Sequence, residues 1–71
     1  EGAEKDIEHA ISLLEKAAEY GEPNALYHLA NCYNVGNGVA KDKKEALRLY
    51  KIAVDMGHPD AQKKVDRLEK K

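Results

Sequence analysis

The 71-residue sequence contains no phenylalanine, tryptophan or threonine. It has only one cysteine, one serine and two prolines. A single cysteine cannot form an internal disulfide, and a structural zinc site needs two or more cysteines. No apolar run approaches the ~18 residues of a membrane span, and the sequence shows no signal-peptide pattern. We therefore expect no disulfide framework, no metal centre and no membrane segment.

The hydrophobic residues are plentiful but small. They make up 42% of the chain, and ten of them are alanines. Because a chain of this length buries only about 60% of its surface, closely packed helices are the favoured way to build a core from alanine. Such a core leaves no room for a deep catalytic pocket. The composition thus predicts one small domain that is not an enzyme and holds no cofactor.

Charge is balanced over the whole chain but not along it. The net charge is −1 and the isoelectric point is near 6.3, which gives no indication of nucleic-acid binding. Residues 1–35 carry two lysines against seven acids, whereas residues 36–71 carry ten basic residues against six acids. We interpret this polarity as solvated helix faces. It would also favour head-to-tail association of copies of the chain.

Apolar residues recur at three- and four-residue steps in four segments, and each segment predicts a helix. The first runs from about Asp6, its expected N-cap, to Tyr20 and closes at Gly21. The second starts at Pro23 and ends near Val35. No segment alternates with period two, so the predicted fold class is all-α.

The third segment opens with the spacing of a capping box. In that motif Asp42 caps the helix, and Glu45 reaches back to the backbone N–H of the cap residue. This helix runs to Gly57. The fourth helix repeats the proline start of the second, at Pro59.

The sequence repeats itself with a period of 36 residues. When residues 10–25 are laid on residues 46–61, six of the sixteen positions are identical: Ala10/Ala46, Leu13/Leu49, Ala17/Ala53, Gly21/Gly57, Pro23/Pro59 and Ala25/Ala61. Two helices in each 36-residue unit are typical of a helical solenoid. In this arrangement alanines that face alanines let the helix backbones approach each other.

A longer pattern extends through the central unit. It reads A-x-x-x-L-A-x-x-Y-x-x-G-x-G-V-x-x-D-x-x-x-A-x-x-x-Y-x-x-A-x-x-x-G from Ala25 to Gly57. This pattern resembles the Sel-1-like repeat, a relative of the tetratricopeptide repeat. Ala30 stands where the family usually has glycine, and Leu49 stands where an aromatic residue is common. The connection at residues 36–39 distinguishes the pattern from the tetratricopeptide repeat, because it lengthens the loop and the period.

The resemblance implies an α-α superhelix, a right-handed solenoid of about four helices in antiparallel pairs. The expected organisation is a single domain over residues 1–71, made of the second helix of a preceding repeat (6–21), one full repeat (22–57) and the first helix of a following repeat (58–71). The resemblance also implies a non-catalytic adaptor or scaffold that binds a protein partner. Some relatives have been described as hydrolases, but those are rich in paired cysteines, and this chain has only Cys32.

Polar residues of the second predicted helix indicate where a partner binds. Three asparagines and a tyrosine recur at steps of three and four residues, which places them on one stripe. Side-chain amides both donate and accept hydrogen bonds, which suits the backbone of an extended peptide. In the related tetratricopeptide family the first helix of each repeat lines the concave groove, so the resemblance implies a groove here with a basic wall 36 residues later. The candidate partner-binding residues are Asn24, Tyr27, Asn31, Asn34, Val35, Lys63, Arg67 and Lys70, with Asp60 on the same wall. The expected partner is a protein or peptide with a carboxylate or acidic side chains.

Three other patterns do not indicate a phosphate-binding, metal-binding or catalytic site. The Gly36-x-Gly38 motif lacks the preceding strand and the following Gly-Lys-Ser/Thr of a phosphate loop. His28 and Cys32 lie one helical turn apart, a spacing at which two side chains can share a metal ion, but two ligands do not complete a structural site. Ser12 has no evident His/acid partnership. We therefore expect no catalytic, cofactor-binding or metal-binding residues.

A second hypothesis is structural. The chain is then a minimal or engineered repeat unit that associates with itself through the exposed faces of its end helices. Because Glu1 rather than methionine opens the sequence, we also expect an excised or processed piece. The free Cys32 favours a reducing compartment such as the cytoplasm, and we expect a soluble protein. The identity of the partner and of the parent protein stays open.

Overall fold

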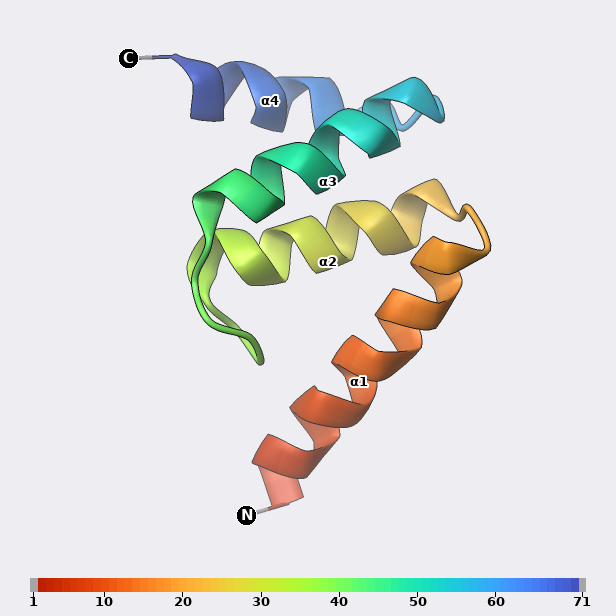
Figure 1. Cartoon of the computed structure of the whole chain (residues 1–71), viewed down its shortest axis with the longest axis vertical. Coiled ribbons are helices and arrows are strands. Elements are labelled where there is room, and N and C mark those ends of the chain that lie inside the picture. The colour runs from red at the N-terminus through yellow and green to blue at the C-terminus, as the bar shows by residue number, and fades with distance from the viewer. Residues whose placement is uncertain (1, 71) are drawn as a thin grey trace.

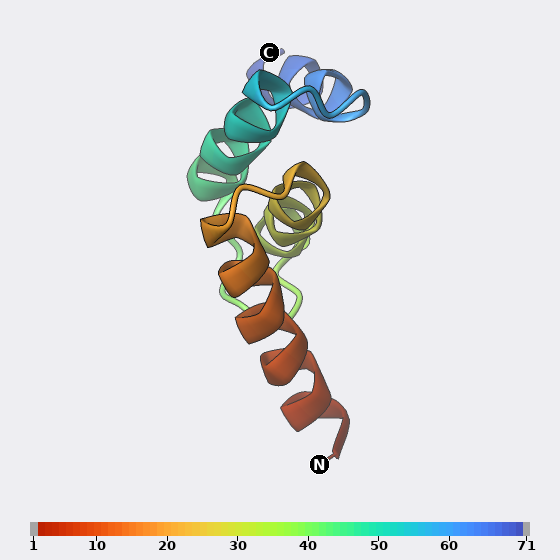
Figure 2. The same cartoon turned by 90° about the vertical axis from the view of Figure 1, so that its right-hand side faces the viewer.

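The computed structural model describes the backbone of residues 2–70 and the side chains of residues 7–70. Within that range it consists of four helices and no strands (Figure 1): α1 (Gly2–Glu19), α2 (Pro23–Val35), α3 (Lys43–Asp55) and α4 (Ala61–Glu69). Each helix packs chiefly on its neighbours along the chain. From the side, α2 and α4 lie toward one side of α3 (Figure 2). The prediction of an all-α superhelix of about four helices is confirmed.

The 36-residue repeat is visible in the backbone hydrogen bonds that end α1 and α3. Both helices close at a glycine in the left-handed region, Gly21 at φ +81° and Gly57 at φ +92°. The two turns make the same pair of N–H···O bonds: Gly21 to Ala18 at 3.0 Å and Glu22 to Ala17 at 3.2 Å, then Gly57 to Val54 at 2.9 Å and His58 to Ala53 at 2.9 Å. These two hydrogen bonds satisfy backbone carbonyls that would otherwise lack a donor at the end of a helix. The predicted glycine stops are therefore confirmed.

The start of α3 confirms one half of the predicted capping box and corrects the other. The Asp42 carboxylate accepts the Glu45 backbone N–H at 3.1 Å, as expected of an N-cap. Glu45 does not reach back to the cap, because its carboxylate accepts hydrogen bonds from Arg48 Nε and Nη2 at 3.1 and 2.5 Å. The hydrogen bond from Arg48 lowers the pKa of Glu45. The Asp42 N–H instead donates to Tyr33 O at 2.9 Å.

The helix α1 begins earlier than predicted. It starts at Gly2, so Asp6 lies inside the helix and the prediction that it forms the N-cap is wrong. At the matching position 36 residues later, the bond from the Asp42 N–H to Tyr33 O ties the preceding loop to α2. Residues 3–5 are alanine, glutamate and lysine, which favour a helix and so accord with a start at Gly2.

The helix α4 begins later than predicted, at Ala61 rather than at Pro59. The cause is His58, whose Nδ1 accepts the backbone N–H two residues further on at 3.1 Å and so stabilises a turn. Glu22 occupies the matching position before α2 and makes no side-chain cap, and there the helix starts directly at Pro23. The two connections share their glycine and proline, and the turn at His58 accompanies the later start of α4.

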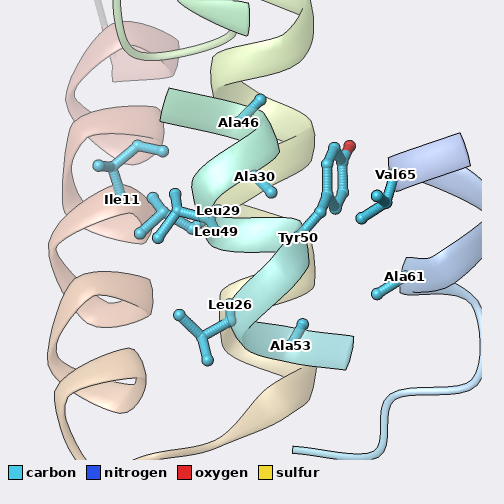
Figure 3. Close-up of a cluster of buried hydrophobic side chains, with 10 residues drawn as sticks. All are labelled: Ile11, Leu26, Leu29, Ala30, Ala46, Leu49, Tyr50, Ala53, Ala61 and Val65. Atoms are coloured by element: carbon cyan, nitrogen blue, oxygen red, sulfur yellow. The ribbon is translucent and has the colours of Figure 1, made fainter. Parts of the chain in front are cut away.

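Small side chains dominate the core (Figure 3). Its completely buried residues are four alanines and one tyrosine: Ala30, Ala46, Ala53, Ala61 and Tyr50. Ile11 of α1 and three leucines of α2 and α3 fill the space beside them. The alanines lie on α2, α3 and α4, and they allow close contact of these helices, as the repeat pattern predicts.

The connection between α2 and α3 packs against α1. Its residue Gly38 has φ +82°, and a Cβ atom at this position would clash with Ile7 and come within 3.0 Å of Ile11 Cγ1. Glycine is therefore required twice, for the backbone conformation and for the close approach. This role agrees with the prediction that the glycines of this connection do not form a phosphate loop.

Candidate protein-binding face

A cleft of about 240 Å³ lies between α2 and α4. It is lined by one aromatic side chain of α2 and by charged side chains at the start and along the length of α4: Tyr27, Asp60, Lys63, Lys64 and Arg67. Ligand pockets for small molecules usually measure 300–1,000 Å³. The cleft therefore suits one side chain or chain end of a larger partner better than a whole small molecule.

Contacts on two sides hold Tyr27 in place. Its ring stacks on the imidazole of His58, with ring centroids 4.3 Å apart and an angle of 13° between the planes. It also lies 5.7 Å from the ring of the buried Tyr50, at a tilt of 59°. An aromatic side chain held by neighbouring rings loses little conformational entropy when a partner binds. Tyr27 is thus preorganised as the apolar wall of the cleft.

Two asparagines of the predicted stripe already have partners within the protein. Asn31 accepts a hydrogen bond from the Tyr50 hydroxyl, and burial raises the pKa of Tyr50 to about 12. Asn34 Oδ1 accepts a hydrogen bond from Lys43 Nζ at 2.8 Å. Each amide oxygen is therefore engaged, and the NH₂ groups are what these side chains can offer to a partner.

The remaining members of the predicted site lie outside the cleft. Asn24 and Lys70 are exposed, and Val35 is 67% exposed at the last position of α2. The structure thus brings Tyr27, Lys63 and Arg67 together in the cleft, while the other five predicted residues do not line it.

Sequence reasoning missed two residues of this region. Lys64 lines the cleft, although it follows Lys63 directly and so was left off the predicted stripe. Its signal in the sequence was the pair of adjacent lysines. His58 supports Tyr27 by stacking. No pattern in the sequence indicated this contact, because it joins two residues 31 positions apart through the packing of α4 on α3.

The comparison with protein families agrees with the fold and the repeat. The family model of the Sel1 repeat matches residues 1–21 and 23–58. The chain belongs to the Sel1 repeat family. Sel1 repeats generally mediate protein–protein interaction, and the family is typically non-catalytic.

Two groups of curated proteins resemble this Sel1 repeat chain. The DAP3-binding cell death enhancer 1 of Rattus norvegicus and that of Mus musculus are each 32% identical over 63 residues, which cover 89% of this chain and 12% of theirs. Chitin synthase regulatory factor 3 of Schizosaccharomyces pombe is 34% identical over 55 residues, or 78% of this chain and 6% of its own. The chain therefore spans a small part of these relatives. No solved structure matches it.

Cysteine and histidine side chains gather into no metal centre in the part of this Sel1 repeat that the structure describes. Among those residues, no group of three or more His, Cys, Asp or Glu side chains lies close enough to hold an ion. Burial raises the pKa of the Cys32 thiol, which keeps it protonated and a poor nucleophile. In addition, no helix within residues 2–70 has both the length and the apolar character needed to cross a membrane.

Proposed function

We propose that this Sel1 repeat unit is a protein-interaction module that holds an extended, acidic peptide against α2 and α4. The observation that carries the proposal is the composition of the cleft between these helices, in which Tyr27 faces three cationic side chains. A carboxylate of the partner would pair with the cations, while the adjoining apolar atoms would pack on the Tyr27 ring.

The neighbouring residues favour a peptide over a compact ligand. Asn31 and Asn34 lie on α2 beside Tyr27, and their NH₂ groups can donate to the carbonyls of an extended backbone. Asp60 is the one acid that lines the cleft. It disfavours a carboxylate at that end, so the acidic group of the partner belongs next to Lys63, Lys64 and Arg67.

The proposal is tested with short fluorescent acidic peptides and fluorescence anisotropy. Replacing Lys63 and Arg67 together by glutamate should weaken binding at least about tenfold, since two charge pairs become repulsive. The control carries the same change of charge at Lys41 and Lys44, which are exposed and do not line the cleft. It should bind within about twofold of the unmodified protein, at equal helicity by circular dichroism.

The salt dependence supplies a second readout. Binding through Lys63, Lys64 and Arg67 should weaken steadily as ionic strength rises, because exposed charge pairs are screened. Failure of every acidic peptide to bind, or an equal loss of affinity in the control variant, would remove the proposed acidic-peptide role.

A further inference from the structure

A groove of about 540 Å³ is lined by residues of α1, α2 and α3, and its two walls are α1 and α3. We call it the α1–α3 groove. Its floor is apolar and contains three leucines that are at most 5% exposed: Leu26, Leu29 and Leu49. Their side chains point from α2 and α3 toward α1 (Figure 3). The groove shares no lining residue with the cleft between α2 and α4, so it is a separate surface from the proposed acidic-peptide site.

Contacts within the chain fix both walls of the α1–α3 groove. A Cβ atom at Gly21, where α1 ends, would come to 3.0 Å from Met56 Cε at the end of α3. Further along α1, Ile7 and Ile11 lie against Gly38 of the connection that leads into α3. The helix α1 is thus held beside α3 at two points. A groove that is already formed in this way costs little ordering when a partner binds.

The 36-residue repeat places a smaller groove of about 310 Å³ at the matching positions of α3 and α4. All five of its lining residues correspond to residues of the α1–α3 groove: Glu15/Lys51, Ala18/Val54, Glu19/Asp55, Leu26/Gln62 and Leu29/Val65. In this copy Lys51 Nζ pairs with Glu69 Oε2 at 2.8 Å, and Glu69 is the counterpart of Tyr33. The copy therefore contains an ion pair that the α1–α3 groove, with Glu15 and Tyr33 at these positions, cannot form.

The rim of the α1–α3 groove carries negative charge. Glu15 and Glu19 stand one helical turn apart on α1, and both are exposed. On the opposite wall, Glu45 already accepts two hydrogen bonds from Arg48. The described part of the chain contains two ion pairs, one between these two residues and one between Lys51 and Glu69, and neither involves α1. The carboxylates of Glu15 and Glu19 are therefore the charges that a partner can neutralise.

We infer that the α1–α3 groove binds a short basic segment of a partner protein. Lysine and arginine combine a long apolar stem with a charged end. In this groove the stem lies on the leucine floor, and the charged end pairs with Glu15 or Glu19 at the rim. Residues 1–35, which include α1 and α2, carry seven acids against two lysines, and this field steers a basic segment toward the groove.

The test measures binding of a capped hexapeptide, Leu-Arg-Arg-Leu-Arg-Arg, by calorimetry and by NMR of methyl-labelled protein. The peptide should bind with a dissociation constant below about 1 mM. It should shift the methyl resonances of Leu29, Leu49 and Ile52, which line the groove. The same peptide with citrulline in place of arginine keeps its shape and loses its charge, so it should bind at least about fivefold more weakly.

Variants of the protein locate the binding site. Glu15→Gln together with Glu19→Gln should weaken binding at least about fivefold, because two charge pairs are lost. Glutamine keeps the size and the helix propensity of glutamate, so the fold should be retained. The matched control is Glu8→Gln together with Glu22→Gln, which removes the same charge at exposed positions that do not line the groove. The control should bind within about twofold of the unmodified protein, at equal helicity by circular dichroism.

Several outcomes would overturn the inference. Failure of the peptide to bind, equal binding of the citrulline peptide, or an equal loss in the control variant would show that the groove does not select a basic segment. Peptide that shifts only resonances of α4 would contradict the proposed site. Salt-sensitive self-association that Glu15→Gln with Glu19→Gln abolishes would assign the groove to a second copy of the chain.

The two proposals of this article fail independently. The glutamate variant of Lys63 and Arg67 should still bind the basic hexapeptide, because neither residue lines the α1–α3 groove. The glutamine variant of Glu15 and Glu19 should still bind acidic peptides, because neither residue lines the cleft. Loss of both ligands in one of these variants would instead indicate that the substitution disturbs the fold.

Discussion

The helices α1 and α3 share one sequence register but differ in their surroundings. On α3, Ala46 and Ala53 are completely buried and Leu49 is 4% exposed, whereas Leu13, the counterpart of Leu49 on α1, is 53% exposed. The two helices differ in their neighbours: α3 packs on α2 and α4, while α1 packs chiefly on α2 and also meets the α2–α3 connection at Gly38. A repeat pattern thus specifies which face of a helix is apolar, and the neighbouring helices determine whether that face is buried.

The difference in packing between α1 and α3 is tested most directly by shortening the matching leucine in each helix. Leu49→Ala should lower the free energy of unfolding by about 2–5 kcal/mol, because it opens a cavity in a filled core. Leu13→Ala should cost less than about 1 kcal/mol, since the side chain is half in water already. Urea denaturation followed by circular dichroism measures both values. Equal losses would show that α1 is as well packed as α3.

Two glycines test whether the α2–α3 connection packs against α1. Both Gly38 and Gly57 have positive φ, so replacement by alanine should cost each about 1–2 kcal/mol. Only Gly38 lies against α1, where the new methyl group would clash with Ile7, while nothing lies within 4 Å at Gly57. Gly38→Ala should therefore be more destabilising than Gly57→Ala by about 1–3 kcal/mol. Thermal melts of the two variants that coincide would argue against the contact between the connection and α1.

The two matching aspartates give a smaller effect. Asp42→Ala should destabilise the protein by about 1 kcal/mol, because it removes the acceptor for the Glu45 N–H. Asp6→Ala should be nearly neutral, since Asp6 lies within α1 and not at the start of the helix. Denaturant midpoints of the two variants are the measurement. A large loss for Asp6→Ala would mean that α1 starts at residue 6 in solution.

The last effect is confined to alkaline pH and concerns Tyr50, the counterpart of Leu14. The pKa of its phenol is raised by burial to about 12, from an ordinary value of 10. A raised pKa means that the folded state holds the proton more tightly, so this contribution to stability is complete below pH 10 and is lost as pH rises toward 12. The free energy of unfolding should therefore decline more steeply between pH 10 and 12 for the unmodified protein than for Tyr50→Phe. Parallel curves would contradict the assignment.

The parts of the fold that depend on local spacing were predictable from the sequence. Four helices, the glycine stops at Gly21 and Gly57 and the cap at Asp42 all follow from patterns a few residues long. The start of α4 was predicted wrongly because a local side-chain contact, from the Asp60 N–H to His58 Nδ1, forms a turn after Pro59. The cap at Asp42 also depends on a contact beyond the capping pattern, because its N–H donates to Tyr33 O on α2.

For the binding face too, some features follow from spacing along a helix and others depend on how the helices pack. Helical spacing placed Tyr27 on one stripe and Lys63 and Arg67 on another, and the resemblance to the repeat family implied that both stripes face the same groove; in the structure these three residues line one cleft. The same spacing gave no information that Asn31 bonds to Tyr50 or that Asn34 bonds to Lys43, because those partners come from α3. Which side of a helix is polar can be inferred from one sequence; what its polar groups already hold requires the packed neighbours.

The packing of each helix chiefly on its neighbours along the chain also governs how the protein folds. Only short loops must close before a contact forms, so little chain entropy opposes the first step and any adjacent pair can nucleate. Folding should then spread from the α2–α3 pair outward, and the end helices α1 and α4, each with one principal helix neighbour, should join last and leave first. The two end helices are thus also the parts of the protein that we expect to exchange most readily between attached and detached states.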